Sequence, residues 1–155
     1  TDQLDRFGII VKLLILTGQR RGEIAGIKPQ CISDKAITWP KETTKNGREH
    51  TLPISNSVKQ LLPHLPQNYN TWAKPKVSLD HLSQVHDWTL HDLRRTYATN
   101  MAALGTPIHV IEKLLNHSSG TIRGVAAIYN RHSYFEEMKI ADAAYEEKLQ
   151  SLFAG

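Results

Sequence analysis

The chain has 155 residues, of which 40% are hydrophobic and 22% charged, so it can bury the core of one ordinary globular domain. No apolar run approaches the length of a membrane-spanning helix, no signal peptide opens the chain, and the single cysteine, Cys31, excludes an internal disulfide and a cysteine-rich zinc site. The formal charge of +4 is unevenly distributed: residues 1–132 carry +7 and residues 133–155 carry −3. The basic body suggests a polyanionic partner, but this charge also fits an ordinary mildly basic protein.

The first half of the chain predicts three helices and a small sheet. In chain order, we expect a helix over residues 4–16 that ends at Thr17-Gly18, a short helix at about 20–27, a strand at 36–39, two strands at 41–45 and 48–54, and a helix at about 56–63. The last two strands flank Asn46-Gly47, the pair most typical of a tight hairpin turn. Pro40 and Pro53 restrict these strands to short, edge-like pieces.

The second half is expected to be helical after an irregular stretch. Thr89 is a good N-cap with Asp92 three residues on, and Ser133 with Glu136 forms the pattern of a capping box. In chain order, we expect irregular chain over 63–88 with a short helix from Ser78 to about Val85, helices at 89–104 and 107–116, a turn at 118–120, a short helix at 122–129 and a helix at 133–152. The whole chain therefore predicts an α+β fold, mostly α-helical with a small antiparallel β-sheet.

Six residues are candidates for a site that acts on an anionic substrate. His91 and Arg94 are three residues apart and project from one face of a helix, where a titratable ring and a fixed cation suit an oxygen-rich anion such as phosphate. Arg20 lies where a turn meets a helix, with Glu23 on the same face to hold its guanidinium. Taken singly, each candidate has a simpler explanation as a solvated cation, a histidine at a helix end or a core tyrosine. The other three candidates are Lys45, His117 and Tyr129.

The order of these residues resembles one family, the tyrosine recombinases or phage-type integrases. Its pattern is an arginine within Thr-Gly-x-Arg-x-x-Glu, a lysine on a β-hairpin, His-x-x-Arg, a histidine within Leu-x-x-His, and a nucleophilic tyrosine soon after. Each motif is weak alone, but all occur here in the right order, from about Leu13 to Tyr134. The matching residues are Arg20, Lys45, His91, Arg94, His117 and Tyr129.

The resemblance implies cleavage of a phosphodiester with neither a metal nor a cofactor. Tyr129 would attack phosphorus and leave a 3′-phosphotyrosine and a free 5′-hydroxyl. Because the pKa of a tyrosine phenol is ordinarily about 10, it needs a base, and His91 is the candidate. The remaining four would act on the phosphate: Arg20 and Arg94 grip the non-bridging oxygens, Lys45 protonates the departing oxygen, and His117 donates a hydrogen bond. Further basic residues would contact backbone phosphates: Arg21, Arg48, Arg95, Lys113 and Arg123.

The partner that the resemblance implies is double-stranded DNA at attachment sites. It also implies a homo-oligomer, a tetramer on DNA, with accessory DNA-bending proteins and no membrane. We expect a cytoplasmic, nucleoid-associated protein of bacterial or phage origin, and the family's N-terminal DNA-binding domain is expected to lie outside this chain, which begins at Thr1. The acidic helix at 133–152 has two expected roles, packing on its own domain or docking on a neighbouring protomer, and both stay open.

Two departures from the common family pattern indicate which subgroup of the family the chain resembles. The gap between His117 and Tyr129 is longer than in many members, and Asn116 stands where many have glycine; both features resemble integrases of prophages and genomic islands. A type IB topoisomerase would use the same constellation, and a non-catalytic DNA-binding module would need only the basic surface. A metal-dependent nuclease is a further alternative, which would have to use residues without recognisable ligand spacing: His81, His86, Asp87, His91 or Asp92.

Overall fold

The computed structural model describes residues 2–117 and 132–154. The predicted turn at 118–120, the predicted helix at 122–129 and Tyr129 itself lie outside the described residues. None of the described helices has the length and apolarity needed to cross a lipid bilayer. The predicted α+β fold with one small antiparallel sheet is confirmed. Its elements are α1 (Asp2–Thr17), α2 (Arg21–Ala25), the 3₁₀ turn η1 (Pro29–Cys31), β1 (Ala36–Trp39), η2 (Lys41–Thr43), β2 (His50–Pro53), α3 (Asn56–Leu61), η3 (Leu62–His64), α4 (Ala73–Ser83), α5 (Leu90–Ala103), α6 (Ile108–Leu115) and α8 (Phe135–Ala154).

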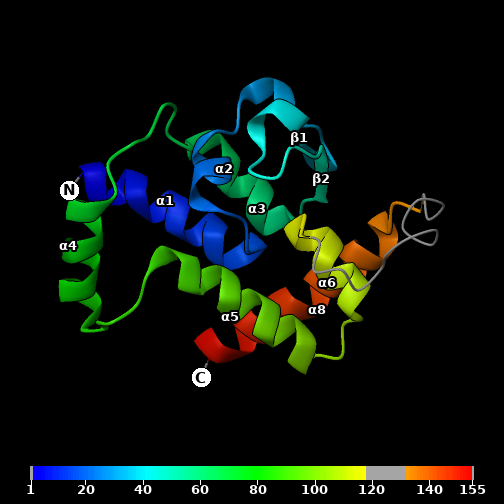
Figure 1. The fold of residues 1–155 in the computed structure, drawn as a ribbon. Helices are drawn as coiled ribbons and strands as arrows, with labels where there is room; N and C mark the ends of the chain where they lie inside the picture. The colour runs from blue at the N-terminus through cyan, green and yellow to red at the C-terminus, as the bar shows by residue number, and fades with distance from the viewer. Residues whose placement is uncertain (1, 118–131, 155) are drawn as a thin grey trace.

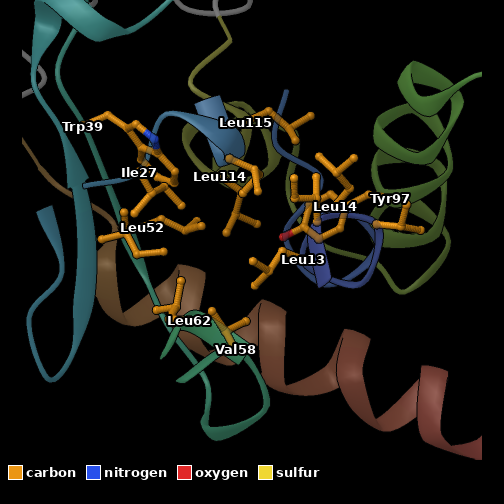
Figure 2. Close-up of a cluster of buried hydrophobic side chains, with 14 of the residues drawn as sticks. Leu13, Leu14, Ile27, Trp39, Leu52, Val58, Leu62, Tyr97, Leu114 and Leu115 are labelled. Atoms are coloured by element: carbon orange, nitrogen blue, oxygen red, sulfur yellow. The ribbon is translucent and has the colours of Figure 1, made fainter. Parts of the chain in front are cut away.

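Helix α1 lies at the centre of the fold, with α2, α3, α4 and α5 packed against it (Figure 1). The predicted amphipathic helix at 4–16 is therefore confirmed. Its inward face belongs to the same core cluster as side chains of α5 and α6, as Figure 2 shows for Leu13, Leu14, Tyr97 and Leu114. Burial of such apolar side chains stabilises the fold by roughly 1.5–3 kcal/mol each. The most deeply buried residues of α1 are Phe7, Ile10, Leu13 and Leu14.

The residue that follows α1 is a glycine, Gly18, and both its backbone conformation and the closeness of α5 require one. Its φ is +65°, a left-handed conformation that glycine adopts without strain. A Cβ at this position would lie 2.4 Å from the ring of Tyr97. The glycine of the Thr17-Gly18 pair therefore allows the end of α1 to approach α5 closely, and this approach brings the residues that follow to the candidate site.

The small sheet is confirmed, but its connection is not the tight hairpin that Asn46-Gly47 predicts. Strands β1 and β2 pair antiparallel, and residues 40–49 form the loop between them. The predicted strand at 41–45 is wrong, and the strand predicted at 48–54 is shorter. Pro40 follows β1 directly and has no N–H to donate to a ladder. Asn46 uses its side chain within the loop instead, where its Oδ1 accepts hydrogen bonds.

Helix α4 is longer than predicted and begins five residues before Ser78, within the stretch expected to be irregular. Pro75 lies in the first turn of the helix, where its missing N–H would have no intrahelical partner, so it does not break the helix. Ser78 lies inside the helix, and its hydroxyl donates to Lys74 O instead of capping a new one. Gln84 ends α4 in the left-handed conformation, with φ 58°.

Helices α5 and α6 follow the sequence prediction closely. Thr89 and Asp92 form a complete capping box, in which each side chain accepts a hydrogen bond from the other residue's backbone N–H. Gly105, with φ +84°, separates the two helices as expected. Helix α6 ends at Asn116, whose φ of 51° is left-handed. The start of α5 and the end of α6 are thus both defined by local sequence signals.

Helix α8 packs on its own domain in this chain and begins two residues after Ser133. Tyr145 Oη donates to Ile15 O at 2.6 Å, and Tyr97 Oη of α5 donates to Asp142 Oδ1 at 2.6 Å. In this structure of a single chain α8 packs in cis, and the choice between the two roles expected for the tail stays a prediction. Exchange with a neighbouring protomer stays a proposal. The buried face of α8 consists of Met138, Ala141 and Tyr145.

The buried carboxyl of Asp142 predicts a pH-dependent stability. Burial raises its pKa to about 7, the hydrogen bond from Tyr97 lowers it, and Glu146 raises it. Because the folded protein favours the protonated form, this stabilisation is complete below the ordinary pKa near 3.8 and is lost as the pH rises through 7. We expect the melting temperature of the wild type, relative to that of Asp142→Asn, to fall as the pH rises from about 4 to about 7.

The comparison with Asp142→Asn also removes the contribution of His50. Burial lowers the pKa of His50 to about 4, so this residue destabilises the folded protein as the pH falls, which is the opposite direction. Its contribution is common to both proteins and cancels in the difference. A difference in melting temperature that stays constant over this range would contradict the role of Asp142.

Candidate active site

Three segments that are distant in sequence line a cleft of about 340 Å³. They are the turn between α1 and α2, the loop between β1 and β2, and the N-terminus of α5. Three of the six predicted residues, Arg20, Lys45 and His91, therefore meet at one cleft, and Arg94 lies one helical turn beyond His91. The full lining is Gln19, Arg20, Arg21, Lys45, Thr89, Leu90 and His91.

Arg94 is buried, with 7% of its surface exposed, and joins the ends of two helices. Its Nη1 donates to Gly18 O at 3.1 Å, and its Nη2 donates to Leu115 O at 2.8 Å. Burial and then the neighbouring Arg20 lower its pKa to about 10, while Glu23 raises it, so Arg94 remains a cation at neutral pH. A guanidinium has five N–H donors in a planar fork, which leaves donors for a ligand beyond the two that hold the backbone.

Arg20 immediately precedes α2 and lies next to a buried carboxylate. Its Nη1 is 3.6 Å from Glu23 Oε1, as the spacing of the two residues predicts. The same Nη1 is buried and has no hydrogen-bond partner within the described part of the chain. A buried donor without a partner loses its hydration without compensation, so it is stabilised by an incoming acceptor.

Lys45 is exposed at the turn of the β1–β2 loop, and its backbone is fixed by the same carboxylate. Lys45 N donates to Glu23 Oε1 at 3.3 Å. Glu23 is only 6% exposed and thus contacts both Arg20 and the loop that bears Lys45. The position of this lysine therefore depends on the loop backbone and not on strand pairing, which differs from the hairpin tip that the sequence predicts.

His91 lies in the first turn of α5 and is surrounded by cations. Partial burial lowers the pKa of its imidazole, and the positive charges of Arg95, Arg94, Arg20 and Lys45 lower it further, in that order. All of these influences disfavour the imidazolium, so the ring is neutral at neutral pH and able to accept a proton. The role predicted for His91 stays a prediction.

Among the described residues, His117 does not line the cleft. His117 follows the C-cap of α6, is exposed, and donates its backbone N–H to Glu112 O at 2.8 Å. Tyr129 lies outside the described residues. Roles for these two residues stay predictions.

The arrangement suits an anion with several oxygens. Arg20 and Lys45 supply N–H donors at the cleft, and Arg94 lies close enough for its charge to act on both His91 and Arg20. The neutral ring of His91 adds a proton acceptor beside them. Within residues 2–117 and 132–154, no three His, Cys, Asp or Glu side chains are grouped so that they could hold a metal ion.

Comparisons with known proteins agree with this chemistry. The model of the phage integrase family matches residues 66–136, which include His91, Arg94, His117 and Tyr129. The chain is 27% identical over 164 residues to the prophage integrase IntZ of Escherichia coli (strain K12), and 26% identical over 139 residues to the tyrosine recombinase XerC of Staphylococcus saprophyticus. The family model and both relatives support membership of the phage integrase family. No solved structure matches it significantly.

The chain spans less than half the length of the relatives it matches. The alignments cover 94% and 70% of the chain but only 40% of the prophage integrase and 44% of the tyrosine recombinase. Arg20 and Lys45 lie before the segment that the family model matches, so their assignment depends on the cleft they share with His91.

Sequence reasoning missed the side chains that support the candidate site. Gln19 is only 2% exposed, and its Nε2 donates to Thr17 O and Leu114 O, both at 2.8 Å. No local pattern indicates a partner 95 residues away. The sequence showed that Asn116 replaces a glycine common in the family, but it did not indicate the hydrogen bonds of Asn116 to Asn46 and Arg48 in the Lys45 loop.

The buried fork of Arg94 gives a stability prediction. Arg94→Lys keeps the charge but offers a single ammonium in place of two diverging donors, so at least one of its two carbonyl partners is left unpaired. We expect a loss of about 1–3 kcal/mol in the free energy of unfolding, measured by chemical denaturation. Arg95→Lys is the matched control, because the Arg95 side chain is 73% exposed and should change stability little. Equal stabilities of the two variants would contradict the structural role.

Proposed function

We propose that this chain is the catalytic domain of a site-specific DNA recombinase, which cuts and rejoins double-stranded DNA without a metal through a 3′-phosphotyrosyl intermediate. The observation that carries the proposal is the cleft at which Arg20, Lys45 and His91 meet, with Arg94 buried one turn away. The names of the two relatives, a prophage integrase and a tyrosine recombinase, support the same reaction class and favour integration or excision of a prophage or genomic island.

In the proposed cleavage step, Tyr129 is the nucleophile. Its phenol oxygen forms a bond to phosphorus while the bond from phosphorus to the 5′-oxygen breaks. The phenolic proton passes to His91, whose lowered pKa keeps the ring neutral and ready, and the departing oxygen takes a proton from the Lys45 ammonium. Rejoining is the reverse: a 5′-hydroxyl attacks the phosphotyrosine, and both protons return. The phosphotyrosyl bond preserves the energy of the broken bond, so no nucleotide is consumed.

The two arginines would stabilise the transition state of this step. Arg20 has a buried Nη1 that lies 3.6 Å from Glu23 Oε1 but makes no hydrogen bond within the described residues, and Arg94 uses only two of its donors on backbone carbonyls. Both are therefore held in place before substrate arrives, which is the condition under which donors stabilise developing charge most strongly. His117 would add a hydrogen bond to the same phosphate from the end of α6.

We further propose that the active protein is a homo-oligomer, a tetramer on attachment-site DNA, in which accessory DNA-bending proteins take part. The C-terminal helix supports a protomer contact, because it carries strongly exposed apolar side chains beyond its buried face. This applies whether α8 stays on its own domain or is exchanged. The exposed residues are Ile140, Leu152 and Phe153, at 71%, 62% and 77%.

The nucleophile can be tested by covalent trapping. We expect the protein to form a denaturant-resistant adduct with a nicked duplex that carries the attachment site, detected as a shifted band on a denaturing gel. Tyr129→Phe should abolish the adduct while leaving the fold intact, because only the attacking oxygen is removed. Tyr134→Phe is the matched control and should keep it. An adduct that depends on Tyr134 would overturn the assignment of Tyr129.

The acid role of Lys45 can be tested by changing the leaving group. A sulfur in place of the bridging 5′-oxygen leaves as a thiolate, whose pKa of about 8.5 in the cysteine case removes the need for a proton. Lys45→Ala should cleave the ordinary strand about 10²–10⁴-fold more slowly and recover on the sulfur-containing strand. Arg94→Ala should not recover, because the non-bridging oxygens are unchanged. Equal slowing of Lys45→Ala on both strands would exclude Lys45 as the acid.

A further inference from the structure

Lys45 lies on a loop that has no strand pairing of its own. Residues 40–49 join β1 to β2, and the lysine is exposed at the turn. Ordering a flexible backbone and a long side chain against a substrate carries an entropy cost. A general acid on such a loop works efficiently only if other contacts fix the loop in place.

Two asparagines provide such a contact between this loop and the end of α6. Asn116 Nδ2 donates to Asn46 Oδ1 at 3.2 Å, and in return Asn46 Nδ2 donates to Asn116 O. Asn116 Nδ2 also donates to Arg48 O at 3.1 Å. The two residues are 70 positions apart and flank the predicted functional residues Lys45 and His117.

The backbone of α6 does not by itself require the amide of Asn116. The residue is the C-cap, with φ 51°, and its backbone N–H is satisfied by the carbonyls of Glu112 and Lys113. Glycine is the usual residue in this left-handed position, and asparagine is the most frequent alternative. A glycine would therefore preserve the helix end, and what asparagine adds is a side chain that reaches the loop.

Asn46 also organises the turn that presents Lys45. Its Oδ1 accepts from Arg48 N at 3.1 Å and from Thr44 Oγ1 at 3.4 Å. On the opposite side, Lys45 N donates to Glu23 Oε1, the carboxylate that lies beside Arg20. The backbone at Lys45 is thus held between α2, which positions an arginine of the site, and the end of α6, which positions His117.

We propose that Asn46 and Asn116 are positioning residues that hold the Lys45 loop over the cleft so that the lysine can protonate the departing 5′-oxygen. This inference rests on the proposed function. The pair touches neither phosphate nor nucleophile in this scheme and acts through Lys45. This role would also give a purpose to asparagine at position 116, where many family members have glycine, because the Asn116 amide contacts the loop and restricts its movement.

The test uses Asn116→Gly, which keeps the left-handed backbone and removes only the side chain. On a nicked attachment-site duplex with the ordinary 5′-oxygen, we expect covalent cleavage about 10–100-fold slower than in the wild type. On the duplex with bridging sulfur, which needs no acid, the variant should match the wild type. Combined with Lys45→Ala, it should add no further slowing, because the contact acts through the side chain that is already absent.

Two further variants make the result specific. Asn46→Ala breaks the same contact from the loop side and should show the same recovery with sulfur. Asn68→Gly is the matched control: Asn68 is also left-handed, with φ 55°, and exposed, but it does not line the cleft. It should cleave both duplexes at the wild-type rate.

The outcomes separate this inference from the proposed function. The positioning role is overturned if Asn116→Gly cleaves the ordinary duplex as fast as the wild type. It is also overturned if the variant is equally slow on both duplexes, because that result indicates general damage to the site. If the wild type itself forms no covalent adduct on either duplex, the proposed function fails, and the positioning role fails with it.

Discussion

The guanidinium of Arg94 is held between two backbone carbonyls that belong to the ends of different helices. One follows α1 and the other ends α6, and both helices pack in the core around Leu13, Leu14 and Leu114. Burying a cation is unfavourable unless its N–H groups are paired, and the two carbonyls meet this requirement. The same charge lies beside the cleft. Arg94 therefore places a positive charge near the site and also links the ends of α1 and α6.

The remaining charges are arranged around this buried cation. Burial and then the like charge of Arg20 lower the pKa of Arg94, and Glu23 opposes this effect. Glu23 is itself nearly buried and contacts both Arg20 and the backbone of Lys45. One carboxylate thus offsets part of the repulsion and fixes the loop, while an excess of positive charge remains for an anionic substrate. A bound phosphate would supply the negative charge that the site lacks.

Local signals in the sequence were enough to predict the helices that present the site. The apolar stripe of α1 and the Thr89–Asp92 capping box of α5 depend on neighbours within a few residues, and both are confirmed. The hairpin predicted at Asn46-Gly47 was wrong because strand pairing depends on partners ten or more residues away. The start of α4 was misplaced because a proline such as Pro75 is tolerated in the first turn of a helix.

The supporting contacts of the site could not be predicted for a similar reason. The partners of Gln19 and of Asn116 are 95 and 70 positions away, and no periodicity in the sequence encodes such distances. The order of the predicted motifs indicated the phage integrase family and its candidate residues. It did not indicate which neighbouring polar side chains hold those residues in position.

The carbonyls at the end of α6 connect these contacts to folding. The last carbonyls of a helix lack intrahelical partners, and here side chains from other segments occupy them. Leu114 O accepts from Gln19 and hydrogen-bonds with the ring of His50, while Leu115 O accepts from Arg94. Opening this helix end must release the α1–α2 turn, the start of β2 and the middle of α5 together. These segments therefore form one cooperative unit, whose backbone amides exchange with solvent through a shared opening instead of separate local ones.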